Sequence, residues 1–297
     1  MTAAAAPLPV RPSRGSAMRA VVAAMTARPS GLIGLVIIAV HVVVALISPM
    51  IVPYDYAVQN AAQMFAKPSA VHWLGTDQLG RDVLTRTLLG GRQAILVTAL
   101  ATLFAVGWGA LVGITVGYLG GRFDDFVMRV IDAFQAVPWL LLMMLIVTIL
   151  GGGVFVLVAV LGFCYGLPAA RVARSATLDV VARDFVSAAC ARGERAFTII
   201  ARELLPNVRD IVLVDGAMQW SWMLLWFSSL SFLGLGVAPP TPDWGLMVSD
   251  ARLYLTVIPL AALAPMIALS SLIVGINLTA DALGKALGVD RAQKPPS

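Results

Sequence analysis

Five long tracts without a single Asp, Glu, Lys or Arg are the strongest constraint on how this chain folds. They cover residues 29–54, 93–121, 133–170, 216–242 and 253–280. A helix needs about 20 mostly apolar residues to cross the hydrocarbon core of a bilayer, so each tract is long enough for a span. Hydrophobic residues make up 59% of the chain and charged residues 12%, and a soluble protein could not bury that much apolar surface. We therefore expect an all-α integral membrane protein.

The third tract is too long for one span. As a single helix, residues 133–170 would extend about 57 Å at 1.5 Å per residue. The tract carries Gly151, Gly152 and Gly153 near its middle, and three consecutive glycines favour a break. We predict two spans there, near 133–150 and 154–173. The chain then has six transmembrane helices, with both termini on the same side.

The distribution of basic residues predicts which side that is. The two terminal tails and the loops on their side carry 16 Lys and Arg, whereas the opposite side carries five. Basic residues accumulate in cytoplasmic loops, so the N and C termini are predicted to be cytoplasmic. The expected organisation is a cytoplasmic tail (1–28), a first helix with an extracytoplasmic loop (29–92), a five-helix core (93–286) and a C-terminal tail (287–297).

The sequence offers little for catalysis or for holding a cofactor. His41 and His72 are the only histidines, and these separated residues are too few for a His/Cys metal site. A phosphate-binding G-x-x-x-x-G-K-[ST] loop is absent, and we find no paired nucleophile and base. No catalytic, cofactor-binding or metal residue is predicted, so the chain is not expected to be an enzyme by itself. The formal net charge of +5 comes from short tracts between long uncharged ones, so no nucleic-acid partner is expected.

Glycines line one face of the second span. Gly109, Gly113 and Gly117 recur at four-residue spacing, which lets another helix approach closely. That helix could belong to this chain or to a partner subunit.

The loop between the fourth and fifth spans is too long to be a simple turn. Asp179 can cap a helix, Gly193 suits a helix C-terminus, and a second helical stretch follows over 195–205. Pro206 then fits the first turn of the next span, where a missing N–H does no harm. The residues alone leave open an amphipathic hairpin on the membrane surface and a docking surface for a partner.

The spacing within this loop resembles a known family. Residues 176–206 resemble the EAA loop of ABC-importer permeases, whose pattern is E-A-A-x-x-x-G-x(9)-I-x-L-P. Ser187 stands where that family usually has Glu, and Glu203 stands where Ile is common. The resemblance implies that the loop couples to an ATPase subunit through Ser187, Ala188, Ala189, Gly193, Leu205 and Pro206.

Two further stretches narrow the resemblance. Residues 72–92 and 230–247 are similar to segments of peptide/nickel importer permeases, specifically the dipeptide/oligopeptide permease C subunit. Their prolines and glycines suggest an outer rim, and Trp244 is typical of the membrane–water boundary. The resemblance implies a type I ABC importer permease fold in the bacterial inner membrane. It also implies a second homologous permease, two ATPase subunits that hydrolyse ATP, and an extracytoplasmic substrate-binding protein. The expected cargo is a di- or oligopeptide, glutathione, a nickel chelate or a similar small solute.

Asp215 is the best candidate for a polar group in the translocation path, because ionisable groups inside spans are costly. Gln219 follows at i+4 and shares its helix face. The alternative is that Asp215 lies near the cytoplasmic interface and pairs with Arg209 or a lipid headgroup. For the whole chain, a secondary transporter or channel is a second hypothesis, which would predict ion-coupling charges and often inverted repeats. An integral-membrane enzyme is a third.

Overall fold

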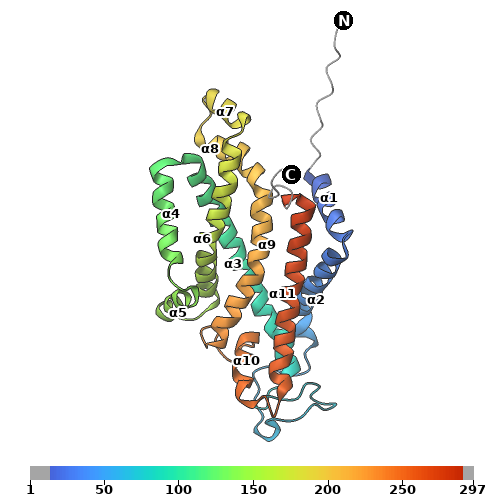
Figure 1. Cartoon of the computed structure of the whole chain (residues 1–297). Coiled ribbons are helices and arrows are strands. Elements are labelled where there is room, and N and C mark those ends of the chain that lie inside the picture. Colours follow the sequence, from blue (N-terminus) through green and yellow to red (C-terminus); the bar gives the residue numbers. More distant parts are fainter. Residues whose placement is uncertain (1–13, 290–297) are drawn as a thin grey trace.

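The computed structural model describes residues 14–289, which form a bundle of α-helices (Figure 1). No β-strand occurs within this range. The eleven helices are α1 (Arg14–Thr26), α2 (Pro29–Ile51), α3 (Val83–Leu119), α4 (Gly121–Gln135), α5 (Trp139–Leu150), α6 (Val154–Val181), α7 (Asp184–Ala191), α8 (Ala196–Ile199), α9 (Leu205–Phe232), α10 (Trp244–Ala251) and α11 (Pro259–Leu287).

Four helices of the described chain, α2, α3, α6 and α11, are long and apolar enough to cross a membrane. The pair α4 and α5 would add a fifth span, although it is bent by 86°. Helix α9 has 28 residues but carries Arg209, Asp210 and Asp215 in its first half. The chain is an all-α, multi-pass membrane protein. The count of six spans and the cytoplasmic termini stay predictions.

One local prediction differs from the structure. The expected span near 133–150 is divided, because α4 ends at Gln135 and α5 begins only at Trp139. Pro138 lies in this break, and a proline disfavours helical geometry in the residue before it. The predicted N-terminal tail contains helix α1, although its sequence shows no strong hydrophobic periodicity. The predicted break at the three glycines is confirmed, since α5 ends at Leu150 and α6 begins at Val154.

Helices α3 and α6 pack closely through the predicted glycine face. A Cβ on Gly109 would lie 2.6 Å from the carbonyl oxygen of Gly166, and one on Gly117 would lie 3.0 Å from the Cβ of Thr177. Only glycine permits such an approach. The glycine stripe therefore serves packing within this chain.

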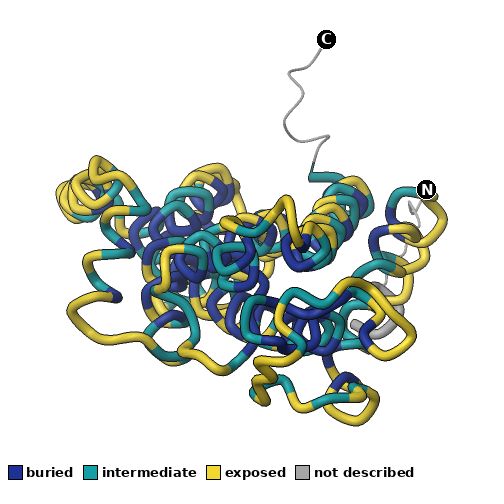
Figure 2. The backbone as a smooth tube through the Cα atoms, turned by 90° about the horizontal axis from the view of Figure 1, so that it is seen from below, coloured by how far each residue is buried: buried dark blue, intermediate teal, exposed yellow. Residues whose placement is uncertain are grey.

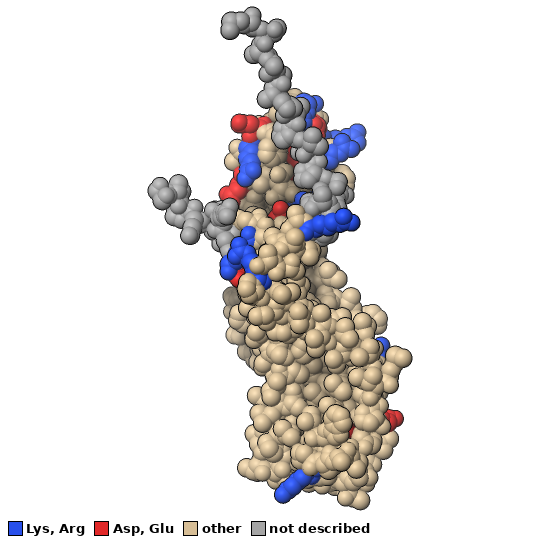
Figure 3. Space-filling model, turned by 90° about the vertical axis from the view of Figure 1, so that its right-hand side faces the viewer, with Lys and Arg blue, Asp and Glu red and all other residues tan. Residues whose placement is uncertain are grey.

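The main core lies where α3, α5, α6, α9 and α11 meet. Its fully buried side chains include Met143, Leu161, Met223, Phe227 and Leu272. Figure 2 shows the buried backbone gathered in the middle of the bundle, with exposed segments around it. Charged side chains gather near one end in Figure 3, and only a few are visible along the rest of this face, as expected for a protein surrounded by lipid.

Candidate coupling loop and outer cap

The loop between α6 and α9 projects from one end of the bundle (Figure 1). Helix α7 ends at Ala191, and Gly193 follows with φ +74°. This left-handed conformation suits glycine, so the predicted glycine elbow is confirmed. The chain then forms α8 and a single π-helical turn, Ile200–Leu204, that continues directly into α9. Pro206 lies in the first turn of α9, as predicted.

Asp179 does not cap the first loop helix. Helix α6 runs on to Val181, so Asp179 lies inside it, and Arg183 occupies the N-cap position of α7. Helix α6 is therefore longer than its uncharged tract suggested. It carries the loop well beyond Ala170, the last residue of that tract.

The inner side of the loop is built into a hydrophobic cluster. Val186, Ala189, Ile199 and Leu204 are buried there. They pack with residues of α6 and α3, namely Ala173, Ala176, Val180, Ala110 and Ile114. This contact joins the loop firmly to the closely packed α3–α6 pair.

The outer side of the loop presents the remaining predicted residues to the surroundings. Ser187, Ala188, Gly193, Leu205 and Pro206 are exposed, whereas Ala189 is fully buried. Phe197 is 81% exposed on the same loop, where it could contact a docked partner. The structure thus separates the six predicted residues into one that holds the loop in place and five that stay accessible. Phe197 was missed because the family pattern leaves its position unspecified.

Asp215 and Gln219 lie on one face of α9, as their spacing predicted. The Gln219 side-chain amide donates to the Asp215 carboxylate at 2.5 Å. Gln219 is buried and Asp215 is half-buried, whereas Met218, Trp222 and Leu225 form the exposed stripe of α9. Arg209 pairs with its neighbour Asp210 at 3.3 Å, so the alternative Arg209–Asp215 ion pair is absent from the described residues.

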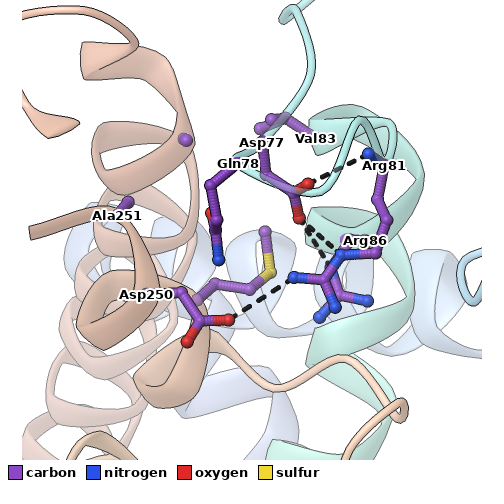
Figure 4. A pocket seen from close by; sticks show the side chains of 9 residues that line it. Asp77, Gln78, Arg81, Val83, Arg86, Asp250 and Ala251 are labelled. Atoms are coloured by element: carbon purple, nitrogen blue, oxygen red, sulfur yellow. Dashed lines mark hydrogen bonds and ion pairs between the residues drawn. The ribbon is translucent and has the colours of Figure 1, made fainter. Parts of the chain in front are cut away.

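The opposite end of the bundle carries an outer cap, which comprises residues 52–82 and the segment around α10. A charged cluster holds it together (Figure 4). The guanidinium of Arg81 donates to Asp77 at 2.6 Å and lies 3.5 Å from Asp250 of α10. Arg86 is 2% exposed and donates to the carbonyl oxygens of Tyr56 and Pro240, at 3.0 and 3.2 Å. Two segments far apart in sequence are therefore fixed to the start of α3.

Neither histidine belongs to a metal centre in the described part of the chain, where no cluster of three or more potential ligands occurs. His72 lies within the cap, with ring nitrogens 2.9 Å from Asp82 and 3.1 Å from Gln63. His41 of α2 lies 2.9 Å from the Ser271 hydroxyl of α11. Both rings make packing contacts and hydrogen bonds within the chain.

Trp244, whose residue type is typical of the membrane boundary, is buried within the chain. Its indole N–H donates to the carbonyl oxygen of Thr87 at 2.8 Å. The ring lies against Gly90 and Gly91, where added Cβ atoms would approach it to 2.9 and 2.7 Å. Trp244 thus fixes α10 to α3.

Asp243 caps α10 and has no exposed surface. Its carboxylate accepts a hydrogen bond from the Leu246 N–H at 3.1 Å. Burial raises the pKa of Asp243 to about 6, although the Leu246 N–H opposes the shift. Sequence reasoning placed this residue only in an outer rim, because the depth of burial depends on how α10 packs.

Comparisons with known proteins agree with the sequence resemblance. A family model described as "Binding-protein-dependent transport system inner membrane component" matches residues 109–289. Another, "N-terminal TM domain of oligopeptide transport permease C", matches residues 16–68.

Curated relatives cover most of the chain. A dipeptide transport system permease protein of Alkalihalophilus pseudofirmus is 32% identical, over 86% of this chain and 84% of its own length. A nickel transport system permease protein of Escherichia coli K12 is 33% identical, over 87% of this chain and 94% of its own. A glutathione transport system permease protein of Pectobacterium atrosepticum is 34% identical, over 74% and 73% respectively.

Proposed function

The chain belongs to the family of binding-protein-dependent transport system inner membrane components and is a membrane permease subunit. We propose that it works as one part of an ATP-driven importer. It forms half of a translocation path, with a second homologous permease supplying the other half. Two ATPase subunits dock on the coupling loops of the two permeases and hydrolyse ATP. An extracytoplasmic binding protein delivers the solute to the outer cap.

The observation that supports this proposal most strongly is the division of the coupling loop into two sides. A hairpin lying on the membrane surface would need its apolar side toward lipid. Here Val186, Ala189 and Ile199 are instead used for packing inside the chain. The loop therefore presents a fixed surface outside the bundle, which suits a groove in another protein.

The same contacts suggest how movement would pass through the chain. Leu204 lies in the π-helical turn that leads into α9, and it packs in the cluster with Ala173 and Val180 of α6. A displacement of the loop by its ATPase would move α6 and α9 together, because well-packed contacts transmit strain. We propose the following domain division. The permease core comprises residues 93–286, and within it the coupling loop comprises residues 176–206. The first helix and outer loop (29–92) attach to this core, and the two tails comprise residues 1–28 and 287–297.

The proposed cargo is a peptide or a similar small solute, as the names of the relatives suggest. Asp215 and Gln219 remain proposed path residues, supported by the rarity of carboxylates within spans. The test is uptake by Asp215→Ala at normal expression, with Asp215→Asn as the uncharged control of similar shape. A reduced rate supports the role, and wild-type uptake by both variants refutes it.

Purification of the tagged chain from its native membrane in mild detergent tests the assembly. We expect a second permease and ATPase subunits to co-purify, in amounts that mass spectrometry can compare with the tagged chain. A chain that is folded and stable but recovered alone in several detergents would favour the secondary transporter or channel.

A further inference from the structure

Helix α4 has three distinct faces, and two of them are exposed. Its core face carries Asp124, Val127, Met128 and Ile131, which are buried or half-buried. At about 100° per residue, the exposed positions divide into two flanks on either side of this face. The charged flank is Arg122, Asp125, Arg129 and Asp132, and the apolar flank is Phe123, Phe126 and Val130.

Helix α4 runs antiparallel along α6, and three contacts at successive levels fix this direction. The Asp124 carboxylate accepts two bonds of 2.5 Å from the Arg174 guanidinium. Farther along α4, Ile131 clusters with Leu167 and Ala170. Near its end, the ring of Phe134 meets that of Phe163 edge to face at 5.5 Å.

This direction decides what surrounds the two flanks. Helix α6 is long and apolar enough to cross the membrane, so α4 lies along a spanning helix rather than flat on the membrane surface. The charged and apolar flanks therefore occur at the same depths. At a bilayer surface, the surroundings change from polar to apolar with depth. This change cannot give two sides of one upright helix different surroundings at the same depth. Large apolar side chains favour lipid, whereas charges at membrane depth face protein or a water-filled cavity.

Most of the charged flank lacks ion-pair partners within the described part of the chain. Asp132 pairs with Arg171 of α6, but Arg122, Asp125 and Arg129 form no ion pair among the described residues. Resting on the permease function proposed above, we propose that the charged flank of α4 lines the aqueous part of the translocation path that opens toward the coupling-loop end. Two arginines and two aspartates alternate along it, so the flank carries no net charge. This pattern suits solutes that carry both an ammonium and a carboxylate, as peptides do.

The test uses single cysteines at neighbouring positions, in inside-out vesicles that contain the complete transporter. Asp125→Cys and Arg129→Cys report the charged flank, and Phe123→Cys and Val130→Cys report the apolar flank at matched depths. A membrane-impermeant anionic methanethiosulfonate is added, and each site is quantified by peptide mass spectrometry. Native Cys190 lies on the coupling loop, where a docked ATPase would cover it, so it is replaced by Ser; native Cys164, which is buried, is the unreactive control.

We expect the charged-flank cysteines to react at least about tenfold faster than the apolar-flank ones, because a thiol in lipid neither ionises readily nor meets the reagent. Trapping the transporter with ATP and vanadate should slow Arg129→Cys severalfold as the path closes on this side. The four variants replace exposed residues that form no ion pair within residues 14–289, and expression of each is checked against wild type.

Three results would overturn the proposal. Equal rates on both flanks would show that no water–lipid boundary follows α4. An Arg129→Cys rate that trapping leaves unchanged would assign the flank to lipid headgroups. Protection in the complete transporter, with reaction only in the separated chain, would place the flank in a subunit interface. A failure of the proposed function is distinguishable, because it would appear as vesicles without an associated ATPase, whatever the flank rates.

Discussion

Gly113 of α3 lies so close to Ala170 of α6 that a Cβ on the glycine would be 2.2 Å from the alanine carbonyl oxygen. Real Cβ atoms do not approach a backbone oxygen so closely, and neither helix backbone can yield without disturbing its neighbours. The two helices therefore behave as one body. The coupling loop rests on this body through Ala189 and Leu204.

Gly113→Ala should consequently destabilise the protein. Overpacking of this kind typically costs about 1–3 kcal/mol. Gly107→Ala is the matched control in the same helix, because no atom lies within 4 Å of its added Cβ. Thermal unfolding in detergent should show a lower midpoint for Gly113→Ala and an unchanged or slightly higher one for Gly107→Ala. Equal midpoints would contradict the close packing.

Substitutions at Ala188 and Ala189 should separate docking from folding. Ala188→Trp adds bulk on the exposed side of the loop, so we expect normal folding but at least severalfold less co-purified ATPase. Ala189→Trp would overfill the buried cluster and lower the unfolding midpoint itself. Ala70→Trp, at an exposed alanine of the outer cap, should change neither quantity. Full ATPase recovery with Ala188→Trp would argue against docking on this side.

Arg86 should be far more sensitive than Arg92, although both lie near the start of α3. Arg86→Gln leaves the carbonyl oxygens of Tyr56 and Pro240 without their charged donor. A buried hydrogen-bond acceptor that loses its partner costs about 1–3 kcal/mol. Arg92 is exposed, so Arg92→Gln should be nearly neutral. Limited proteolysis of the outer cap should be faster in Arg86→Gln alone. Similar cleavage of the two variants would exclude Arg86 as the link between the cap segments.

Asp243 should make stability depend on pH in the unusual direction for a carboxylate. Its pKa is raised to about 6 in the folded chain, against about 3.9 when unfolded. The folded state thus binds the proton more tightly. The stabilisation is complete below about pH 4 and is lost as the pH rises through 6, by up to about 3 kcal/mol.

The control for this pH dependence is Asp243→Asn, which keeps a side-chain oxygen for the α10 cap but cannot titrate. The unfolding midpoint of wild type, relative to that variant, should fall between about pH 4 and pH 7. A difference that stays constant over this range would show that Asp243 is not held as described.

The features that sequence predicted well depend on local chemistry. The elbow at Gly193, the break at Gly151–Gly153 and the position of Pro206 follow from backbone preferences of single residues. The sequence identifies the glycine face of α3 but not its partner helix, because the glycine spacing shows that a helix can approach closely and does not show which one. The coupling motif was found through the spacing of Ala188, Ala189 and Gly193, which belongs to a family pattern.

The features that sequence missed depend on tertiary packing. Asp215 and Gln219 were correctly placed together, but their position relative to the exposed stripe of α9 depends on how the bundle assembles. Trp244 has the chemistry of a boundary residue, but its ring is buried against Gly90 and Gly91 of α3. Asp179 looked like a helix cap because α6 continues past the end of its apolar tract.

A photo-crosslinking amino acid at Ser187 would test the central claim most directly. Ser187 is exposed on the outer side of the coupling loop, so the probe should not disturb the fold, and the same probe at exposed Ala70 of the outer cap is the control. Irradiation of native membranes should link position 187 to an ATPase subunit, identified by mass spectrometry, and position 70 to none. Crosslinks from position 187 only to lipid, in membranes where the chain is folded, would contradict the account.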